Sequence, residues 1–303
     1  MKVLVTGSTG FIGSALVSLL TTGGHVVTRL VRSQPRPGAR EVRWDPVAGV
    51  VDQAGLEGLD AVVHLAGENI AAARWTAKRK AKIRDSRIKG TRLLCESLAR
   101  LQQPPKVLVC ASAIGYYGDR GDEILTEEST SGTGFLAEVC REWELAAEAA
   151  VQRGIRVVHV RIGIVLSPAG GALAKMLFPF RMGFGVVLGT GRQYMSWIAL
   201  DDLVGSISHA LRTDTLRGPV NAVAPNPVTN LEFTRTLGRT LARPTLLPMP
   251  AFAVRLAFGE MGDELLLASA RVQPNRLLVS GYVFRFPKLD GALQHLLERK
   301  KLG

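Results

Sequence analysis

A glycine-rich segment near the N-terminus has the residue types and spacing of a turn that holds phosphates. The segment Gly7–Gly13 (GSTGFIG) follows an apolar run, Lys2–Thr6, and opens a stretch with helical spacing, Phe11–Thr22. In such a turn the first glycine allows the sharp change of direction, the second lets a pyrophosphate approach the backbone, and the third allows close packing of helix on strand. Free amides at the helix start then meet the phosphates. The segment therefore predicts a dinucleotide site, with contacts from Gly7, Thr9, Gly10, Phe11, Ile12 and Gly13.

The end of the second predicted strand, His25–Val31, indicates which dinucleotide is bound. An NAD site usually has Asp or Glu there, which bonds the ribose hydroxyls. Here Arg32 follows the strand, and the first acid is Glu41. A guanidinium can bind a 2′-phosphate through paired hydrogen bonds. The sequence therefore predicts NADP (NADPH) as the cofactor. The alternative is that Arg32 is only an exposed cation at a strand end.

A third predicted strand, Ala61–Leu65, ends in small residues. Leu65, Ala66 and Gly67 give a surface that can lie beside the ribose or the adenine edge of the cofactor. His64 lies within this strand, and we expect it to be a packed core histidine and not a catalyst.

Strands and helices alternate along the first half of the chain. Further strands are expected at 107–111, 155–166 and 220–223, and further helices at 76–101, 135–153 and 200–211. This alternation predicts an α/β protein, namely a Rossmann-type parallel sheet with helices on both faces and a smaller, partly interleaved C-terminal lobe. The expected NADP-binding domain is 1–166 with return elements around 196–224, and the substrate-side lobe is 167–195 and 225–303.

Composition limits the partners of the protein. The 303 residues carry a formal net charge of +12, with the densest basic stretch at 74–92. That stretch is read as a solvated helix face, as a polyanion-binding surface, or as the source of one or two cations for cofactor phosphates. No aromatic platform accompanies it, so we expect no nucleic acid partner.

No apolar run reaches the length of a membrane helix and no signal peptide is evident, which predicts a cytoplasmic protein. Three scattered cysteines predict neither disulfides nor a metal site.

Several motifs resemble the extended short-chain dehydrogenase/reductase superfamily. They are the segments 5–13, 64–67 (HLAG) and 111–118 (ASAIGYYG). Further pieces resemble its epimerase-like subfamily with a C-terminal region of unknown function, whose members are labelled sugar-nucleotide epimerases. These pieces are 66–70 (AGENI), Ser86-Arg87, Trp143-Glu144, 197–202 (WIALDD) and the tail 258–297.

The resemblance implies a catalytic serine, matched by Ser112, and a Tyr-x-x-x-Lys pair whose tyrosine acts as general acid or base. The window 134–144, where that pair is expected, contains no tyrosine and no lysine. The candidate substitutes are Tyr117, Tyr116 and Glu138. For Tyr117 the alternative is substrate contact or packing, and for Glu138 it is an exposed helical carboxylate.

The resemblance also implies that Glu68, Lys82, Arg87, Ala111 and the Val165 region lie near the cofactor. The function that follows is an NADP-dependent oxidoreductase or epimerase acting on a hydroxylated small molecule, which can be nucleotide-linked. The alternative, favoured by the missing Tyr–Lys pair, is a non-catalytic or weakly catalytic NADP-binding sensor or partner-binding protein. Homodimer formation is left open.

Overall fold

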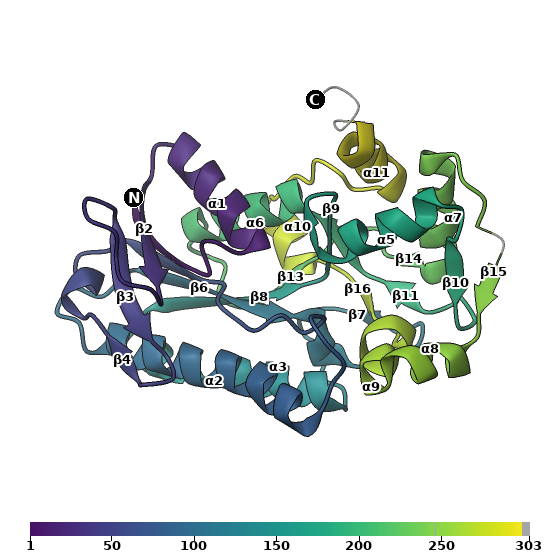
Figure 1. Ribbon diagram of the computed structural model, residues 1–303. Coiled ribbons are helices and arrows are strands. Elements are labelled where there is room, and N and C mark those ends of the chain that lie inside the picture. The colour runs from purple at the N-terminus through teal and green to yellow at the C-terminus, as the bar shows by residue number, and fades with distance from the viewer. Residues whose placement is uncertain (246, 299–303) are drawn as a thin grey trace. The chain divides into compact units, whose positions relative to one another are not determined.

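The apolar runs of the first half form neighbouring strands of one mostly parallel sheet (Figure 1). The computed structural model describes residues 1–245 and 247–298. Across the sheet the order is β13-β8-β6-β5-β1-β2-β3-β4. The bounds are β1 Lys2–Thr6, β2 Val26–Val31, β3 Glu41–Asp45, β4 Val50–Val51, β5 Ala61–His64, β6 Val107–Ala113, β8 Arg156–Ile162 and β13 Gly218–Ala222.

The register of the central strands brings the candidate site segments to one edge of the sheet. Thr6 on β1 is paired with His64 on β5, and His64 is paired with Cys110 on β6. All three strands are parallel, so the segments that follow them begin at the same level. From β1 the order runs to β2 on one side and to β5 on the other, which is the switch point where α/β sheets bind ligands.

Helices cover both faces of this sheet (Figure 1). Helix α1 buries Leu16, Val17 and Leu20, and the core of the opposite layer joins Leu94 and Leu98 to strand residues. This burial of apolar side chains on a parallel sheet is the main favourable term for such a fold. The bounds are α1 Phe11–Thr22, α2 Ala77–Ala99, α3 Phe135–Leu145, α4 Glu148–Gln152 and α6 Leu200–Arg212, with a 3-10 turn, η1, at Ala54–Leu56.

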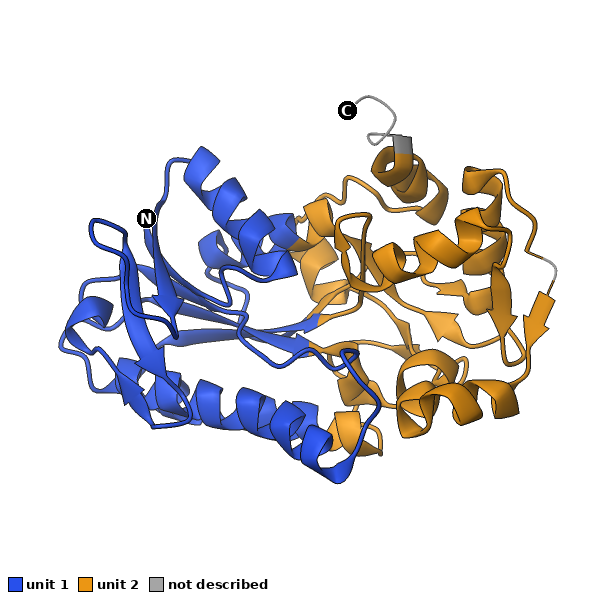
Figure 2. Ribbon diagram, in the orientation of Figure 1, with its two compact units in different colours: residues 1–112, 139–161, 204–220 blue, residues 113–138, 162–203, 221–303 orange. Residues whose placement is uncertain are grey.

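The chain forms two compact units, each assembled from separate stretches (Figure 2). Unit 1 is 1–112, 139–161 and 204–220, and unit 2 is 113–138, 162–203 and 221–303. This division differs from the predicted domains, because 113–138 and 162–203 cluster with the C-terminal part and the units are similar in length. The chain leaves unit 1 directly after Ser112 on β6 and after Arg161 on β8.

Unit 2 consists of short strand pairs and helices around its own core, in which Trp197, Phe233 and Leu293 are buried. Its strands pair as β7 Ile124–Leu125 with β16 Arg271–Val272, β9 Ile164–Ser167 with β12 Trp197–Ala199, β10 Val186–Leu188 with β15 Leu247–Met249, and β11 Tyr194–Met195 with β14 Val228–Thr229. Its helices are α5 Gly171–Arg181, α7 Asn230–Leu241, α8 Ala251–Phe258, α9 Glu260–Gly262, α10 Asn275–Val279 and α11 Leu289–Glu298, with single turns η2 Ile114–Tyr117 and η3 Asp263–Leu267.

Most predicted elements lie where the sequence places them, with two corrections. The expected strand 155–166 is broken into β8 and β9 at Gly163, where a Cβ would lie 2.7 Å from the Ser196 carbonyl oxygen. The expected helix 135–153 is two helices, α3 and α4. Strands β3 and β4 were not predicted at all. Within the described ranges, no helix combines the length and apolar character that crossing a membrane requires.

Candidate dinucleotide-binding site

The glycine turn packs directly against the segment that follows β5. Gly7 has φ +64°, and a Cβ there would lie 2.9 Å from the Leu65 carbonyl group. At Gly13 a Cβ would lie 2.1 Å from the Gly7 carbonyl oxygen. Both positions therefore exclude larger residues. At Gly7 the backbone is left-handed, and at Gly13 the helix packs too closely on the turn to leave room for a Cβ.

The start of α1 is free to receive an anion. Gly10 is the N-cap and offers no side chain, and the first turn of the helix contains no acidic residue. The backbone amides of Phe11, Ile12 and Gly13 thus have no capping partner among the residues that the structure describes. Helix macrodipole and free amides together favour a phosphate at this point. A diphosphate fits the turn, although contacts by Thr9, Phe11 and Ile12 remain predictions.

A buried hydrogen-bond network fixes the segment after β5 beside the turn. Thr6 Oγ1 accepts the Leu65 and Ala66 amides, both at 3.0 Å, and lies 2.8 Å from His64 Nδ1. The hydroxyl proton of Thr6 therefore goes to Nδ1, which leaves the ring proton on Nε2, 3.1 Å from Thr91 Oγ1. Burial lowers the pKa of His64 to about 4, so the ring is neutral. His64 is a core residue that positions Leu65 and Ala66.

Arg32 follows β2 on the surface, as the sequence predicts. Its charge is close enough to Asp45 to act on that carboxyl. The pKa of Asp45 is lowered first by the backbone amides of Ala48 and Val47, and then by the charges of Arg43 and Arg32. Arg32 forms no ion pair with a carboxylate in the described part of the chain. Its guanidinium is accordingly available to a phosphate, and its role toward a 2′-phosphate stays a prediction.

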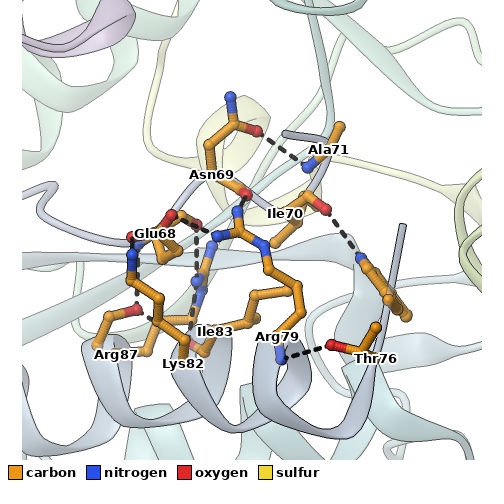
Figure 3. Close-up of polar contacts among 11 residues, drawn as sticks. Glu68, Asn69, Ile70, Ala71, Thr76, Arg79, Lys82, Ile83 and Arg87 are labelled. Carbon is orange, nitrogen blue, oxygen red and sulfur yellow. Dashed lines mark hydrogen bonds and ion pairs between the residues drawn. The ribbon is translucent and has the colours of Figure 1, made fainter. Parts of the chain in front are cut away.

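The segment after Gly67 is bonded to α2 by two half-buried arginines, Arg79 and Arg87 (Figure 3). Arg79 Nη1 donates to Glu68 Oε1 at 2.6 Å and Nη2 donates to the Asn69 carbonyl, while Lys82 Nζ lies 3.4 Å from Glu68 Oε2. The pKa of Glu68 is lowered, mainly by the hydrogen bond from Arg79 and to a smaller extent by Lys82. Glu68 is therefore an ionised carboxylate held between two cations.

Arg87 lies beneath the same segment. Its Nη1 donates to the carbonyl oxygens of Glu68 at 3.0 Å and Ile83 at 3.1 Å, and its Cζ lies 5.1 Å from the centre of the Trp143 ring. Burial lowers the pKa of Arg87. A Cβ on Gly67 would lie 3.6 Å from the guanidinium carbon. Arg87 thus supports the backbone at Gly67, while Lys82 keeps an exposed ammonium group; direct contact of either with the cofactor stays a prediction.

A buried ion pair includes Glu144, the last residue of the window in which the tyrosine–lysine pair was expected. Ser112 Oγ, on β6, donates to Glu144 Oε1 at 2.7 Å, and Arg161 on β8 donates to both oxygens of Glu144, at 2.8 and 2.9 Å. The side chains of Arg161 and Glu144 are 3% and 14% exposed. Glu144 received no role from the sequence, although it closes the window 134–144 and stands in the quoted Trp-Glu motif.

The two tyrosines after Ser112 belong to unit 2 and differ in exposure. Tyr117 is fully buried, and its hydroxyl lies 2.7 Å from Asn221 Oδ1 and 2.9 Å from the Thr126 carbonyl oxygen. This interior position favours packing, which was the alternative for Tyr117, over acid–base catalysis. Tyr116 is partly exposed, with its ring edge-on to Tyr117 at 5.3 Å. Glu138 is exposed.

Three further residues from the sequence analysis lie on strands or helices of the two units. Ala111 is buried on β6, next to Ser112. Val165 lies on β9 of unit 2, where it is paired with Ile198. Asp202, also in unit 2, accepts the Arg285 and Phe286 amides at 2.8 and 2.9 Å, which gives it a structural role in that unit.

The sheet, its switch point and the glycine turn define a Rossmann-type α/β protein with a dinucleotide site. Comparison with known families agrees: residues 3–222 match the model described as the NAD dependent epimerase/dehydratase family, and 249–296 match a domain of unknown function, DUF1731. The chain belongs to this NAD dependent epimerase/dehydratase family.

Similar proteins occur in bacteria and in mammals. An epimerase family protein of Mycobacterium tuberculosis is 46% identical over 98% of both chains, and human epimerase family protein SDR39U1 is 40% identical over 98% of this chain and 100% of its own. A structure of human SDR39U1 (isoform 2) with NADPH has a TM-score of 0.89 at 38% identity, covering 98% of this chain and 99% of that one. A nucleoside-diphosphate sugar epimerase from Corynebacterium glutamicum has a TM-score of 0.81 at 41% identity, covering 98% of this chain and 58% of that one.

Proposed function

We propose that the protein is an NADPH-dependent oxidoreductase that acts on a hydroxylated, nucleotide-linked small molecule. The observation that carries the proposal is the glycine turn at the uncapped start of α1, with an exposed Arg32 at the end of the neighbouring strand. The turn supports diphosphate binding, and Arg32 supports the choice of the phosphorylated ribose. The human relative with NADPH and the sugar epimerase of Corynebacterium glutamicum support the cofactor and the substrate class.

Bound NADPH supplies hydride transfer, and the protein supplies orientation and a proton path. Ser112 and Glu144 offer such a path in place of a tyrosine and a lysine. When a substrate hydroxyl is oxidised and its hydride leaves for the oxidised cofactor, Ser112 Oγ can accept the hydroxyl proton while its own proton passes to the Glu144 carboxylate. Reduction of a carbonyl uses the same path in reverse, with the proton returning from Glu144 through Ser112 to the carbonyl oxygen. Arg161 donates to both oxygens of Glu144 and so orients the carboxylate toward Ser112.

A second candidate is an NADPH-binding protein without turnover. The observation that favours it is the burial of both hydroxyls: Ser112 is 2% exposed and Tyr117 is 0% exposed, and each is bonded inside the protein. In this case Ser112, Glu144 and Arg161 serve only to join α3 to the sheet.

Turnover measurements separate the two candidates. NADPH absorbance is followed with a panel of sugar nucleotides, ketones and quinones, for the wild-type protein and for Ser112→Ala. Ser97→Ala is a matched control, since Ser97 is a buried serine on α2 whose hydroxyl donates to the Leu93 carbonyl oxygen. Substrate-dependent oxidation that Ser112→Ala abolishes and Ser97→Ala retains supports the oxidoreductase. Saturable NADPH binding without oxidation across the panel supports the second candidate and contradicts the first.

A further inference from the structure

Three large apolar side chains are exposed together at the C-terminal end of helix α5 in unit 2. Phe178, Met182 and Phe184 are 74%, 60% and 62% exposed. Phe178 and Met182 are four residues apart, so they lie on the same face of α5. Phe184 lies in the turn that closes the helix, because its amide donates to the Pro179 carbonyl oxygen at 2.9 Å. Exposed apolar side chains that gather in this way are typical of an interaction surface.

A fourth exposed apolar side chain lies on a neighbouring strand. Leu247 is 56% exposed and begins β15. It is paired with Val186 of β10, and Val186 follows Phe184 by two residues. The end of α5 and the start of β15 therefore present one surface of unit 2. Its apolar cluster consists of Phe178, Met182, Phe184 and Leu247.

A surface cavity lined by arginines adjoins this apolar cluster. The cavity has a volume of about 530 Å³, and its lining includes Arg235, Arg239 and Arg243. All three arginines are exposed. Arg235 and Arg239 are four residues apart on one face of α7, and Arg243 follows the end of that helix. Arg243 Nε donates to the Arg181 carbonyl oxygen at 2.8 Å, which attaches the cavity to the end of α5, directly before Met182.

The surface is positively charged, because its two stretches of chain contain no acid. Residues 168–200 and 233–259 have neither Asp nor Glu. Two acids from outside these stretches lie nearby. Glu232 lines the cavity, but its carboxylate accepts the amide and the hydroxyl of Thr229, at 2.7 and 2.9 Å. Asp290 lies 3.6 Å from Arg239, in an exposed pair that screens little of the arginine charge.

We propose that the apolar cluster and the arginine cavity form a docking surface for a membrane that contains anionic phospholipid. Phenylalanine and aliphatic side chains enter the boundary between headgroups and acyl chains, while arginines beside them bind lipid phosphates. This charge complementarity selects the anionic membrane as the occupant. The inference goes beyond the proposed function and does not depend on it. Peripheral binding of this kind needs no helix that crosses the bilayer.

Two other occupants fit the surface less well. A second copy of this chain, docked through the same face, would bring the arginines of both copies together, and like charges repel. A single-stranded nucleic acid would use arginines and aromatic rings, but Met182 and Leu247 offer no ring on which a base can stack. A membrane uses the aliphatic side chains, the aromatic side chains and the cations together.

The first experiment measures co-flotation of the full chain with lipid vesicles. One set of vesicles is phosphatidylcholine alone, and the other also contains about 30 mol% phosphatidylglycerol, both in about 0.1 M salt. Wild-type protein should bind the anionic vesicles at least about tenfold more tightly than the neutral ones. Binding should weaken as the salt concentration rises, because counter-ions screen exposed charges.

The second experiment separates the arginine cavity from the net charge of the protein. One variant neutralises the cavity with Arg235→Gln, Arg239→Gln and Arg243→Gln together. The matched control removes the same charge from exposed positions of the basic stretch in unit 1, with Arg74→Gln, Lys78→Gln and Arg92→Gln together. The cavity variant should bind anionic vesicles at least about tenfold more weakly than wild type, and the control should differ by less than about twofold.

The third experiment tests insertion of the apolar cluster. Phe178→Ser with Phe184→Ser should weaken vesicle binding at least about tenfold and leave the Tm within about 2 °C of wild type, because both side chains are exposed. Val47→Ser with Leu145→Ser is the control, since these side chains of unit 1 are 96% and 69% exposed. It should leave vesicle binding unchanged. In Phe178→Trp, the emission of the added tryptophan should shift to shorter wavelength when anionic vesicles are added.

The inference is overturned if wild-type protein does not bind anionic vesicles, or if the cavity and cluster variants bind them as tightly as wild type. It is also overturned if light scattering shows a dimer that Phe178→Ser with Phe184→Ser dissociates, or if an oligonucleotide binds this surface and vesicles do not. NADPH affinity, followed by fluorescence, should be unchanged in all variants. Failure of the wild-type protein to bind NADPH would remove the proposed function and leave the docking surface standing.

Discussion

The guanidinium of Arg161 binds both carboxylate oxygens of Glu144, with Nε 2.8 Å from Oε1 and Nη2 2.9 Å from Oε2. The same Oε1 accepts the hydroxyl proton of Ser112 at 2.7 Å. Arg161 lies on β8, Ser112 on the adjacent β6 and Glu144 on α3. The ion pair therefore joins a helix to two neighbouring strands and fixes Ser112 at the carboxyl end of β6.

Glu144→Gln should lower the free energy of unfolding by about 3–5 kcal/mol, because it leaves the charge of Arg161 buried without a counter-charge. Glu142→Gln is the control. Glu142 is paired with Arg84 at the surface, where an ion pair contributes about 1 kcal/mol or less. Urea denaturation of both variants measures the difference. Equal losses would contradict a buried ion pair at Glu144.

Arg32→Ala should weaken NADPH binding about 10- to 100-fold and NADH binding less than about threefold, because a hydrogen bond to a charged group is worth about 1.5–3 kcal/mol. Arg40→Ala, at an exposed arginine just before β3, should change neither affinity by more than about twofold. Fluorescence titration with both dinucleotides gives the ratio. A similar loss for NADH would mean that Arg32 does not select the 2′-phosphate.

Gly13→Ala should abolish saturable NADPH binding and destabilise the protein. The added Cβ would lie 2.1 Å from the Gly7 carbonyl oxygen, so the turn must open before any phosphate can reach its amides. Gly291→Ala, in α11 of unit 2, meets open space and should stabilise the protein by about 0.5–1 kcal/mol. Thermal unfolding and cofactor titration check both variants, and tight NADPH binding by Gly13→Ala would disprove the role of the turn.

Stability should fall as the pH drops from about 6.5 to about 4, in part because of His64. Burial lowers its pKa from 6.5 to about 4 in the folded state. In that window the unfolded chain binds a proton that the folded chain excludes, so the fold loses up to about 3 kcal/mol at the acid end. Urea denaturation across this range should show a shallower dependence for His64→Gln. His159, whose pKa is also lowered by burial, leaves a residual slope.

An unchanged slope in His64→Gln would mean that this histidine does not titrate with unfolding.

The glycine turn could be predicted from sequence because its requirements are local. The order of strand, glycines and helix lies within 22 residues, and the structure places β1 at 2–6 and α1 at 11–22 as expected. The position of Arg32 could be predicted for the same reason, because Arg32 is the residue directly after the end of β2. The cofactor prediction depends on short stretches in which backbone geometry determines residue type.

The Glu144–Arg161 pair could not be predicted in the same way. Its residues are 17 positions apart on a helix and a strand, and only the tertiary packing of α3 on the sheet brings them together. The break at Gly163 and the burial of Tyr117 are also tertiary effects, since each depends on residues from distant stretches, Ser196 and Asn221. Such contacts leave no local periodicity in the sequence.

The discontinuous make-up of the units has a practical consequence for anyone who wishes to express the nucleotide-binding half alone. Unit 1 needs 139–161 and 204–220 as well as 1–112. A fragment that stops at residue 166 would lack strand β13 and the whole of helix α6, exposing the apolar edge and face that they cover. Truncation is therefore expected to yield insoluble material, and a soluble nucleotide-binding half requires the two later stretches to be grafted on through designed linkers.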